Sequence, residues 1–209
     1  MTIIEPLRQD PEYPTILTSP PAGPVRGVAA PVSAGTDPDV LMRRHFEAQD
    51  DRPADWRDLH AAELSPYHRS LLMNDGTVTR LLEAFALEPI AAVGVSEHEP
   101  TTVQSHNRWL DVRPEDEVVA RYVDLVGMRS GTRYLRAESL IVMNRLPAGF
   151  RDALQSQAAG IGAALQAMKA EPRRQLLYFG GTFDSVCARS YRIIVRGVPS
   201  LVINEWFLQ

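Results

Sequence analysis

The 209-residue chain has a single cysteine, Cys187, so it cannot form an intrachain disulfide, which favours a reducing compartment. No apolar stretch approaches the ~20 residues needed to cross a bilayer. The first residues also lack the basic segment and apolar run of a signal peptide. We therefore predict a cytoplasmic protein that does not associate with membranes.

Positive charge is also in short supply. The net charge is −4, with 22 Lys and Arg against 26 Asp and Glu, so no general attraction to nucleic acid is expected. The five histidines show no H-x-x-x-H or H-E-x-x-H spacing, which argues against a zinc site. The content of 44% hydrophobic residues is enough to bury a core. The predicted partner is a small molecule or another protein, and the sequence does not set the oligomeric state.

The chain divides by composition near residue 36. Residues 1–36 contain many prolines and little periodic pattern, which predicts an extended arm or a disordered tail. Residues 37–209 have the length and pattern of one domain. The prolines of the first part are Pro6, Pro11, Pro14, Pro20, Pro21, Pro24 and Pro31.

Helical and extended patterns alternate along the predicted domain. Thr36 or Asp37 can cap a first helix, and Asp75 with Gly76 separates two further helices. The fold class predicted is α+β, a mainly antiparallel sheet flanked by helices. Helical patterns cover residues 36–49, 65–74, 77–88, 146–158 and 160–172, and extended patterns cover 89–99, a hairpin over 117–144 and a second hairpin over 185–208.

Charged residues interrupt the apolar faces of several predicted strands. Arg121 shares a face with Val119, Val123 and Leu125, and Glu205 shares one with Leu201, Ile203 and Phe207. Buried charges need partners, because desolvation costs several kcal/mol per ion. Two interpretations follow. Either Arg121 and Glu205 pair with each other or with Arg189 and Glu138 in a core network of ion pairs, or the charges line an internal cavity that holds an anionic ligand.

Two other features permit an ordinary structural explanation. Cys187 has no neighbouring base in the sequence and is predicted to be a core residue rather than a nucleophile. The run Gly160-Ile161-Gly162 lacks the context and third glycine of a dinucleotide-binding loop. It either ends a helix or exposes backbone N–H groups to a carboxylate.

Four segments together resemble the chorismate lyase (chorismate pyruvate-lyase) family, and especially its actinobacterial branch that forms 4-hydroxybenzoate. The resemblance covers roughly residues 62–209, in matching order and approximate spacing. The segments are NDGTVTRLLEA, RYVDLVG with YLRAESLIVMNRLP, GIGAAL, and ARSYRIIVRGVPSLVINEWFL.

The resemblance implies a fold and a site. The family fold is a mainly antiparallel sheet that encloses a ligand cavity, which helix–turn–helix flaps close off from solvent. The resemblance places the carboxylate-binding arginine at Arg121 and the glutamate that contacts the ring hydroxyl at Glu205. Backbone N–H groups of Val78 and of Ile161, within the run that ends at Gly162, would complete the carboxylate site.

The sequence departs from the better-known ubiquinone-pathway lyases at one position. Those enzymes have an arginine around the position of Glu138, where this chain resembles the actinobacterial branch. A second charged contact to the substrate would then involve Glu138 itself or a replacement cation, Arg189 or Arg192.

The implied reaction is elimination of pyruvate from chorismate to give 4-hydroxybenzoate, with no cofactor or metal. Arg121 would hold the substrate, and Glu205 would assist proton movement. One alternative is a repurposed enzyme of a specialised-metabolite pathway that acts on another cyclic or aromatic acid. A second is a non-enzymatic module that binds an aromatic acid, which is disfavoured because residues 1–60 contain no DNA-binding helix-turn-helix pattern.

Overall fold

The computed structural model describes residues 37–100, 107–156, 160–169 and 171–209, and the predicted N-terminal arm lies outside these ranges. Six strands form one fully antiparallel sheet in the order β1-β2-β3-β6-β5-β4. The strands are β1 (Ile90–His98), β2 (Val118–Gly127), β3 (Arg133–Val142), β4 (Pro172–Gly180), β5 (Cys187–Val195) and β6 (Val198–Phe207). Both predicted hairpins are present, and the α+β class is confirmed. The sequence analysis assigned no strand to residues 172–180.

Six α-helices and three short 3₁₀ turns complete the described part of the chain. They are α1 (Pro38–Arg43), α2 (Pro66–Met73), α3 (Val78–Ala86), α4 (Asn107–Leu110), α5 (Phe150–Ser156), α6 (Ile161–Ala167), η1 (Gln49–Asp51), η2 (Ala61–Glu63) and η3 (Met143–Arg145). The predicted cap at Asp37 is confirmed, since its side chain accepts a hydrogen bond at the start of α1, and Ser65 does the same at the start of α2. Thr77 occupies the N-cap of α3 without a side-chain hydrogen bond.

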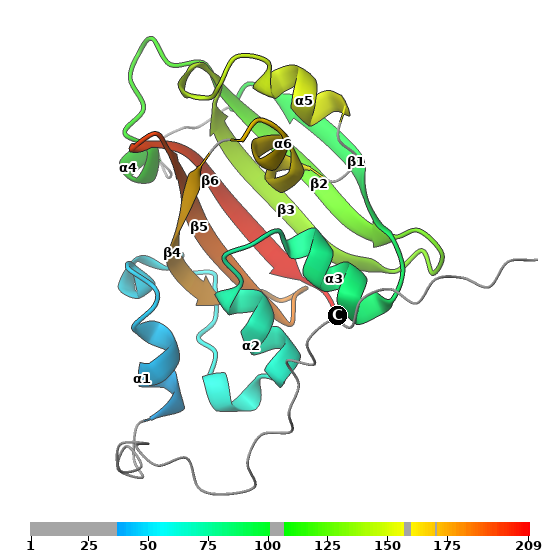
Figure 1. Cartoon of the computed structure of the whole chain (residues 1–209). Helices are drawn as coiled ribbons and strands as arrows, with labels where there is room; N and C mark the ends of the chain where they lie inside the picture. The colour runs from blue at the N-terminus through cyan, green and yellow to red at the C-terminus, as the bar shows by residue number, and fades with distance from the viewer. Residues whose placement is uncertain (1–36, 101–106, 157–159, 170) are drawn as a thin grey trace, which may run out of the picture. The chain divides into compact units, whose positions relative to one another are not determined.

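The helices α2, α3, α5 and α6 cover one face of the sheet (Figure 1). Leu72 and Leu82 from α2 and α3 pack against the end of the sheet that contains Leu135. Leu154 and Leu165 from α5 and α6 pack over the other end. Because side chains alternate along a strand, this covered face receives the odd-numbered residues of β3, β5 and β6. The face that was predicted to carry Glu205 is therefore the face under the helices.

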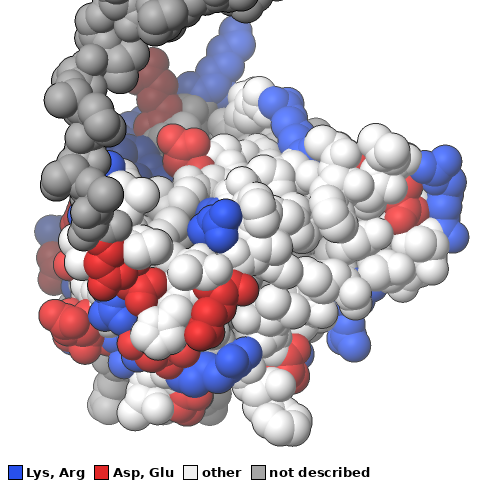
Figure 2. Space-filling view, turned by 90° about the horizontal axis from the view of Figure 1, so that it is seen from below, with Lys and Arg blue, Asp and Glu red and all other residues white. Residues whose placement is uncertain are grey.

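The opposite face carries a second, smaller apolar layer. Leu110 of α4 packs there against Leu140 and Val202, and Trp56 packs against Tyr178. None of the helices in the described ranges is long and apolar enough to cross a membrane. On the surface shown in Figure 2, the described Arg and Lys side chains are interspersed with Asp and Glu.

Candidate active site

A pocket lies on the covered face of the sheet, beneath the N-terminal ends of α3 and α6. Most of its wall is aliphatic, and its charged lining residues are Arg121, Arg174 and Glu205. The full lining is Gly76, Thr77, Val78, Thr79, Ala92, Arg121, Val123, Leu125, Leu135, Ala137, Ser139, Gly160, Ile161, Gly162, Arg174, Tyr191, Ile193, Ile203 and Glu205.

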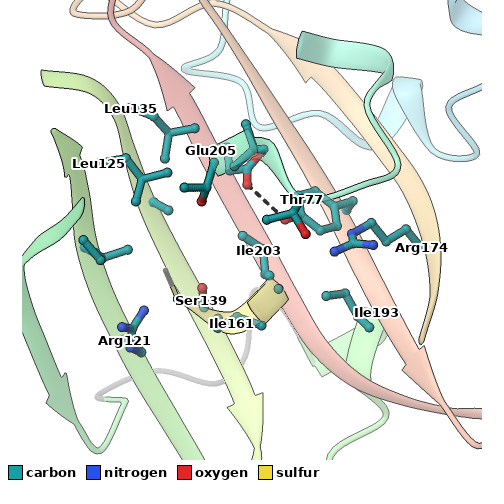
Figure 3. Close-up of a pocket in the computed structure, with 18 of the residues that line it drawn as sticks. Thr77, Arg121, Leu125, Leu135, Ser139, Ile161, Arg174, Ile193, Ile203 and Glu205 are labelled. Atoms are coloured by element: carbon teal, nitrogen blue, oxygen red, sulfur yellow. Dashed lines mark hydrogen bonds between the residues drawn. The ribbon is translucent and has the colours of Figure 1, made fainter. Parts of the chain in front are cut away.

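Strand register explains why these residues meet although they lie far apart in the sequence. Arg121 pairs with Ser139, Ser139 with Ile203, and Ile203 with Tyr191, so one row crosses four strands. Glu205 lies two residues further along β6 and therefore belongs to the same face. Figure 3 shows the result: Arg121 lies at one side of the pocket, with Ser139 next to it, and Glu205 projects from the neighbouring row.

Arg121 is almost completely buried, with 3% of its surface exposed. Its Nε lies 3.4 Å from Oε1 of Glu97, the residue opposite it on β1, without the alignment of a hydrogen bond. Burial lowers the pKa of the guanidinium, and the charge of Glu97 opposes this shift. An arginine with one long contact to a carboxylate retains hydrogen-bonding capacity toward the pocket.

Glu205 is also buried, with 3% of its surface exposed, and its partner is Arg189. Nε of Arg189 donates to Oε2 of Glu205 at 2.8 Å, and Nη2 lies 2.8 Å from the same oxygen without hydrogen-bond alignment. Nη1 of Arg189 donates to the carbonyl oxygens of Leu72 and Asn74 at the end of α2. The carboxylate therefore has a buried counter-charge, as the ion-pair interpretation of the sequence expected.

Tyr191 forms a hydrogen bond with the second oxygen of the same carboxylate. Its hydroxyl donates to Oε1 of Glu205 at 3.0 Å, the hydrogen bond drawn as a dashed line in Figure 3. Burial raises the pKa of Tyr191, and the nearby charge of Glu205 raises it further. Tyr191 is therefore a neutral donor that fixes the orientation of Glu205, whose remaining lone pairs can accept from a ligand.

The helix ends above the sheet contribute backbone donors. Val78 and Ile161 are the first residues of α3 and α6, so their N–H groups have no carbonyl partner within their own helices. The two helix ends touch: a Cβ added to Gly162 would lie 3.1 Å from Oγ1 of Thr77. Val78, Ile161 and Gly162 all line the pocket, so these segments meet at the place that the sequence analysis expected.

The structure does not bring every predicted site residue into this pocket. Glu138 projects from the opposite face of β3, where it accepts a hydrogen bond from the hydroxyl of Tyr122 at 2.6 Å. Arg189 is fully buried and does not line the pocket; it contacts two lining residues, the carboxylate of Glu205 and the ring of Tyr191. Arg192 is on the face of β5 that also carries Ser190, and its Nε donates to the side chain of Gln175.

Three polar lining residues on the strands were missed in the sequence analysis as site residues: Arg174, Ser139 and Tyr191. Ser139 and Tyr191 lie on faces that were identified, and their proximity to Arg121 and Glu205 follows from the strand register alone. Arg174 belongs to β4, which was not predicted. The apolar and aromatic run Leu176 to Phe179, followed by glycines, was the signal available for this strand.

Comparison with known proteins shows a consistent similarity. The chain is 27% identical over 157 residues to a chorismate pyruvate-lyase of Mycobacterium tuberculosis (strain ATCC 25618 / H37Rv), which covers 68% of this chain and 79% of the relative. It is 28% identical over 155 residues to a chorismate pyruvate-lyase of Mycobacterium leprae (strain TN), with coverages of 68% and 73%. The resemblance found in the sequence is thereby confirmed.

Family models and solved structures give two further comparisons. No family model matches the sequence. Among solved structures, a proposed regulator from Escherichia coli CFT073 is similar with a TM-score of 0.41 and 12% identity, over 57% of this chain and 95% of that chain.

Proposed function

We propose that this chain is a chorismate pyruvate-lyase, which eliminates pyruvate from chorismate and leaves 4-hydroxybenzoate. The ether bond between the ring and the enolpyruvyl group breaks with its electron pair going to the oxygen, the ring loses a proton, and the enolate that leaves takes up a proton on carbon to become pyruvate. Aromatisation of the ring supplies the driving force, so the reaction needs no cofactor. The protein must position a dianion and assist the proton movement.

The observation that carries this proposal is that Arg121 and Glu205 both line one largely aliphatic pocket, in a chain similar to chorismate pyruvate-lyases. The ring would lie over the aliphatic floor formed by sheet residues such as Leu135 and Ile203, beneath the starts of α3 and α6. A carboxylate of the ligand would bind Arg121, because a guanidinium matches carboxylate geometry. N–H groups of Val78 and Ile161 would donate to the same carboxylate.

Glu205 would accept the hydrogen bond of the ring hydroxyl at the other end of the ligand. Both oxygens of Glu205 accept hydrogen bonds in the structure, Oε2 from Arg189 and Oε1 from Tyr191. In this arrangement Glu205 is suited to act as acceptor for the ring proton or as an orienting contact. The role of general acid toward the leaving ether, which the sequence left open, is less compatible with this pairing.

The proposal is tested by incubating the purified protein with chorismate and following both products. Pyruvate is measured with a coupled dehydrogenase, and 4-hydroxybenzoate by chromatography. We expect equal amounts of the two, formed at a rate proportional to the protein concentration, and a loss of this activity in Arg121→Gln.

Different results would point to different functions. Folded protein that binds 4-hydroxybenzoate without turning over chorismate would contradict the enzyme assignment and favour a ligand-binding module. Folded protein that neither binds 4-hydroxybenzoate nor consumes chorismate would favour another cyclic or aromatic acid as substrate.

A further inference from the structure

Arg174 brings a second cation to the pocket, from the strand at the opposite edge of the sheet. It lies on β4, whereas Arg121 lies on β2, and four strand intervals separate them. At ~4.8 Å per interval the two strands are about 19 Å apart. In Figure 3 the guanidinium of Arg174 points inward, toward Thr77, and Ile203 and Ile161 lie between it and Arg121.

The hydrogen bonds of Arg174 leave part of its guanidinium available. Nη1 donates to the carbonyl oxygen of Asp75 at 2.6 Å, which ties the side chain to the turn between α2 and α3. Nε is shielded from solvent and has no hydrogen-bond partner in the described part of the chain. A buried donor of this kind is costly unless a ligand or water satisfies it. The edge of the guanidinium that includes Nε is therefore suited to bind a carboxylate in a bidentate manner.

The charges around the pocket favour a ligand with two separate anionic groups. Arg189 neutralises Glu205, and Glu97 makes only a long contact to Arg121. Arg121 and Arg174 therefore remain as cations at opposite sides of one pocket, with aliphatic residues between them. A single carboxylate is too small to contact both, whereas a ring acid with a second carboxylate on a short side arm carries one group for each.

We propose that Arg174 binds the second carboxylate of the substrate, the one on the enolpyruvyl side arm, while Arg121 binds the ring carboxylate. This inference rests on the proposed function and extends it with a residue that determines substrate specificity. Across the sheet Arg174 lies on the far side of Glu205 from Arg121, because β4 is two strands beyond β6, and Tyr191, which donates to Glu205, lies on β5 between them. The side arm of chorismate is next to the ring hydroxyl, so both groups would lie at this end.

The assignment separates substrate from product. Chorismate has two carboxylates, and 4-hydroxybenzoate keeps only the one expected at Arg121. Once pyruvate has been eliminated, Arg174 no longer contacts the aromatic product. Arg174 therefore contributes to substrate affinity and not to product affinity, which favours exchange of product for new substrate.

The test compares two stable ligands by calorimetry, 4-hydroxybenzoate and 3-(carboxymethoxy)-4-hydroxybenzoate, which adds a side-arm carboxylate. Arg174→Gln should weaken binding of the dicarboxylate by about 10- to 100-fold, the range for a lost charged hydrogen bond. Binding of 4-hydroxybenzoate should change far less, and KM for chorismate should rise together with the dicarboxylate Kd. Arg174→Lys keeps the charge without the paired donors, so its affinity for the dicarboxylate should lie between those of wild type and Arg174→Gln.

Arg173→Gln is the matched control, because it removes the same charge from the adjacent, exposed position of β4. It should leave both affinities unchanged, and thermal unfolding should verify that each variant is folded. Equal weakening of both ligands by Arg174→Gln, an effect on neither, or the same effect from Arg173→Gln would overturn the inference.

The two proposals fail in distinguishable ways. If Arg174→Gln weakens binding of the dicarboxylate selectively but wild-type protein does not consume chorismate, the proposed function is contradicted and Arg174 remains a carboxylate site. Wild-type protein that consumes chorismate with an unchanged KM in Arg174→Gln would contradict only the role of Arg174. Wild-type protein that binds neither ligand would overturn both.

Discussion

Replacement of Glu205 by glutamine should destabilise the protein, because it leaves a buried cation without its counter-charge. Arg189 has no exposed surface, and Glu205 is the carboxylate beside it, 2.8 Å from Nε. Breaking a buried ion pair by removing one partner costs about 3–5 kcal/mol. The carbonyl oxygens of Leu72 and Asn74 still accept from Arg189 in the variant. We therefore expect the lower end, about 3 kcal/mol, which reduces the folding equilibrium constant roughly 100-fold.

A double-mutant cycle isolates the interaction between the two charges. Glu205→Gln, Arg189→Met and the double variant are unfolded in urea, and the free energies of unfolding are compared. The double variant contains no unpaired buried charge, so its loss of stability should be smaller than the sum of the two single losses by at least about 2 kcal/mol. Equal m-values across the series would show that the variants unfold from comparable states.

An exposed ion pair serves as the control. Arg136 and Asp184 have side chains that are 43% and 51% exposed, and Asp184→Asn should cost less than about 1 kcal/mol. Additivity of the Glu205 and Arg189 losses within about 0.5 kcal/mol would refute the reasoning, since it would mean that the two groups do not stabilise one another.

Three further predictions concern other parts of the molecule. Arg121→Gln should weaken 4-hydroxybenzoate binding by about 10- to 100-fold in calorimetry, because a buried charged donor to the ligand is lost, and unchanged affinity would contradict its assignment. Cys187 is buried and its pKa is raised to about 12 by burial, so a thiol reagent at pH 8 should label it only after denaturation; rapid labelling of native protein would contradict this burial. Burial acts to raise the pKa of Asp116, but the N–H of Arg113 and the guanidinium of Arg145 outweigh it and hold the pKa below the usual 3.8. The stability that Asp116 contributes is present above pH 3.8 and is lost as the pH falls through the lower pKa of the folded state. Asp116→Asn should therefore lose less free energy of unfolding on acidification than wild type. Identical acid titrations of the two proteins would argue against the ion pair with Arg145.

Much of the fold was predictable because it depends on local patterns. The alternation in β2, β3, β5 and β6 identified the strands, and it also identified which residues share a face with Arg121 and Glu205. Register across the sheet was not predictable in this way, since it depends on how hairpins and non-adjacent strands align. The rows that join Arg121 to Tyr191, and Glu97 to Arg121, therefore required the structure.

The candidate site was predictable to the same extent. The two interpretations of Glu205, an ion pair or a pocket residue, were treated as alternatives, and the structure contains both in one side chain. A carboxylate with two oxygens can contact Arg189 with one and face the pocket with the other, so periodicity alone had no means to separate the cases. Arg174 was missed because an edge strand that begins with proline and two arginines has a weak apolar pattern.

The arrangement of arginines also links the charge of the pocket to the position of its backbone donors. Arg189 donates to the carbonyl oxygens of Leu72 and Asn74, and Arg174 donates to that of Asp75. These carbonyls lie in the turn that leads from α2 into α3, so guanidinium groups on β5 and β4 hold this turn against the sheet. Val78 follows four residues after Asn74, and the two bonds from Arg189 to this turn remain in place when Arg174 is changed. A change at Arg189 would therefore remove the counter-charge of Glu205 and also disturb the expected carboxylate site. A change at Glu205 would break the ion pair but leave the hydrogen bonds from Arg189 to the turn.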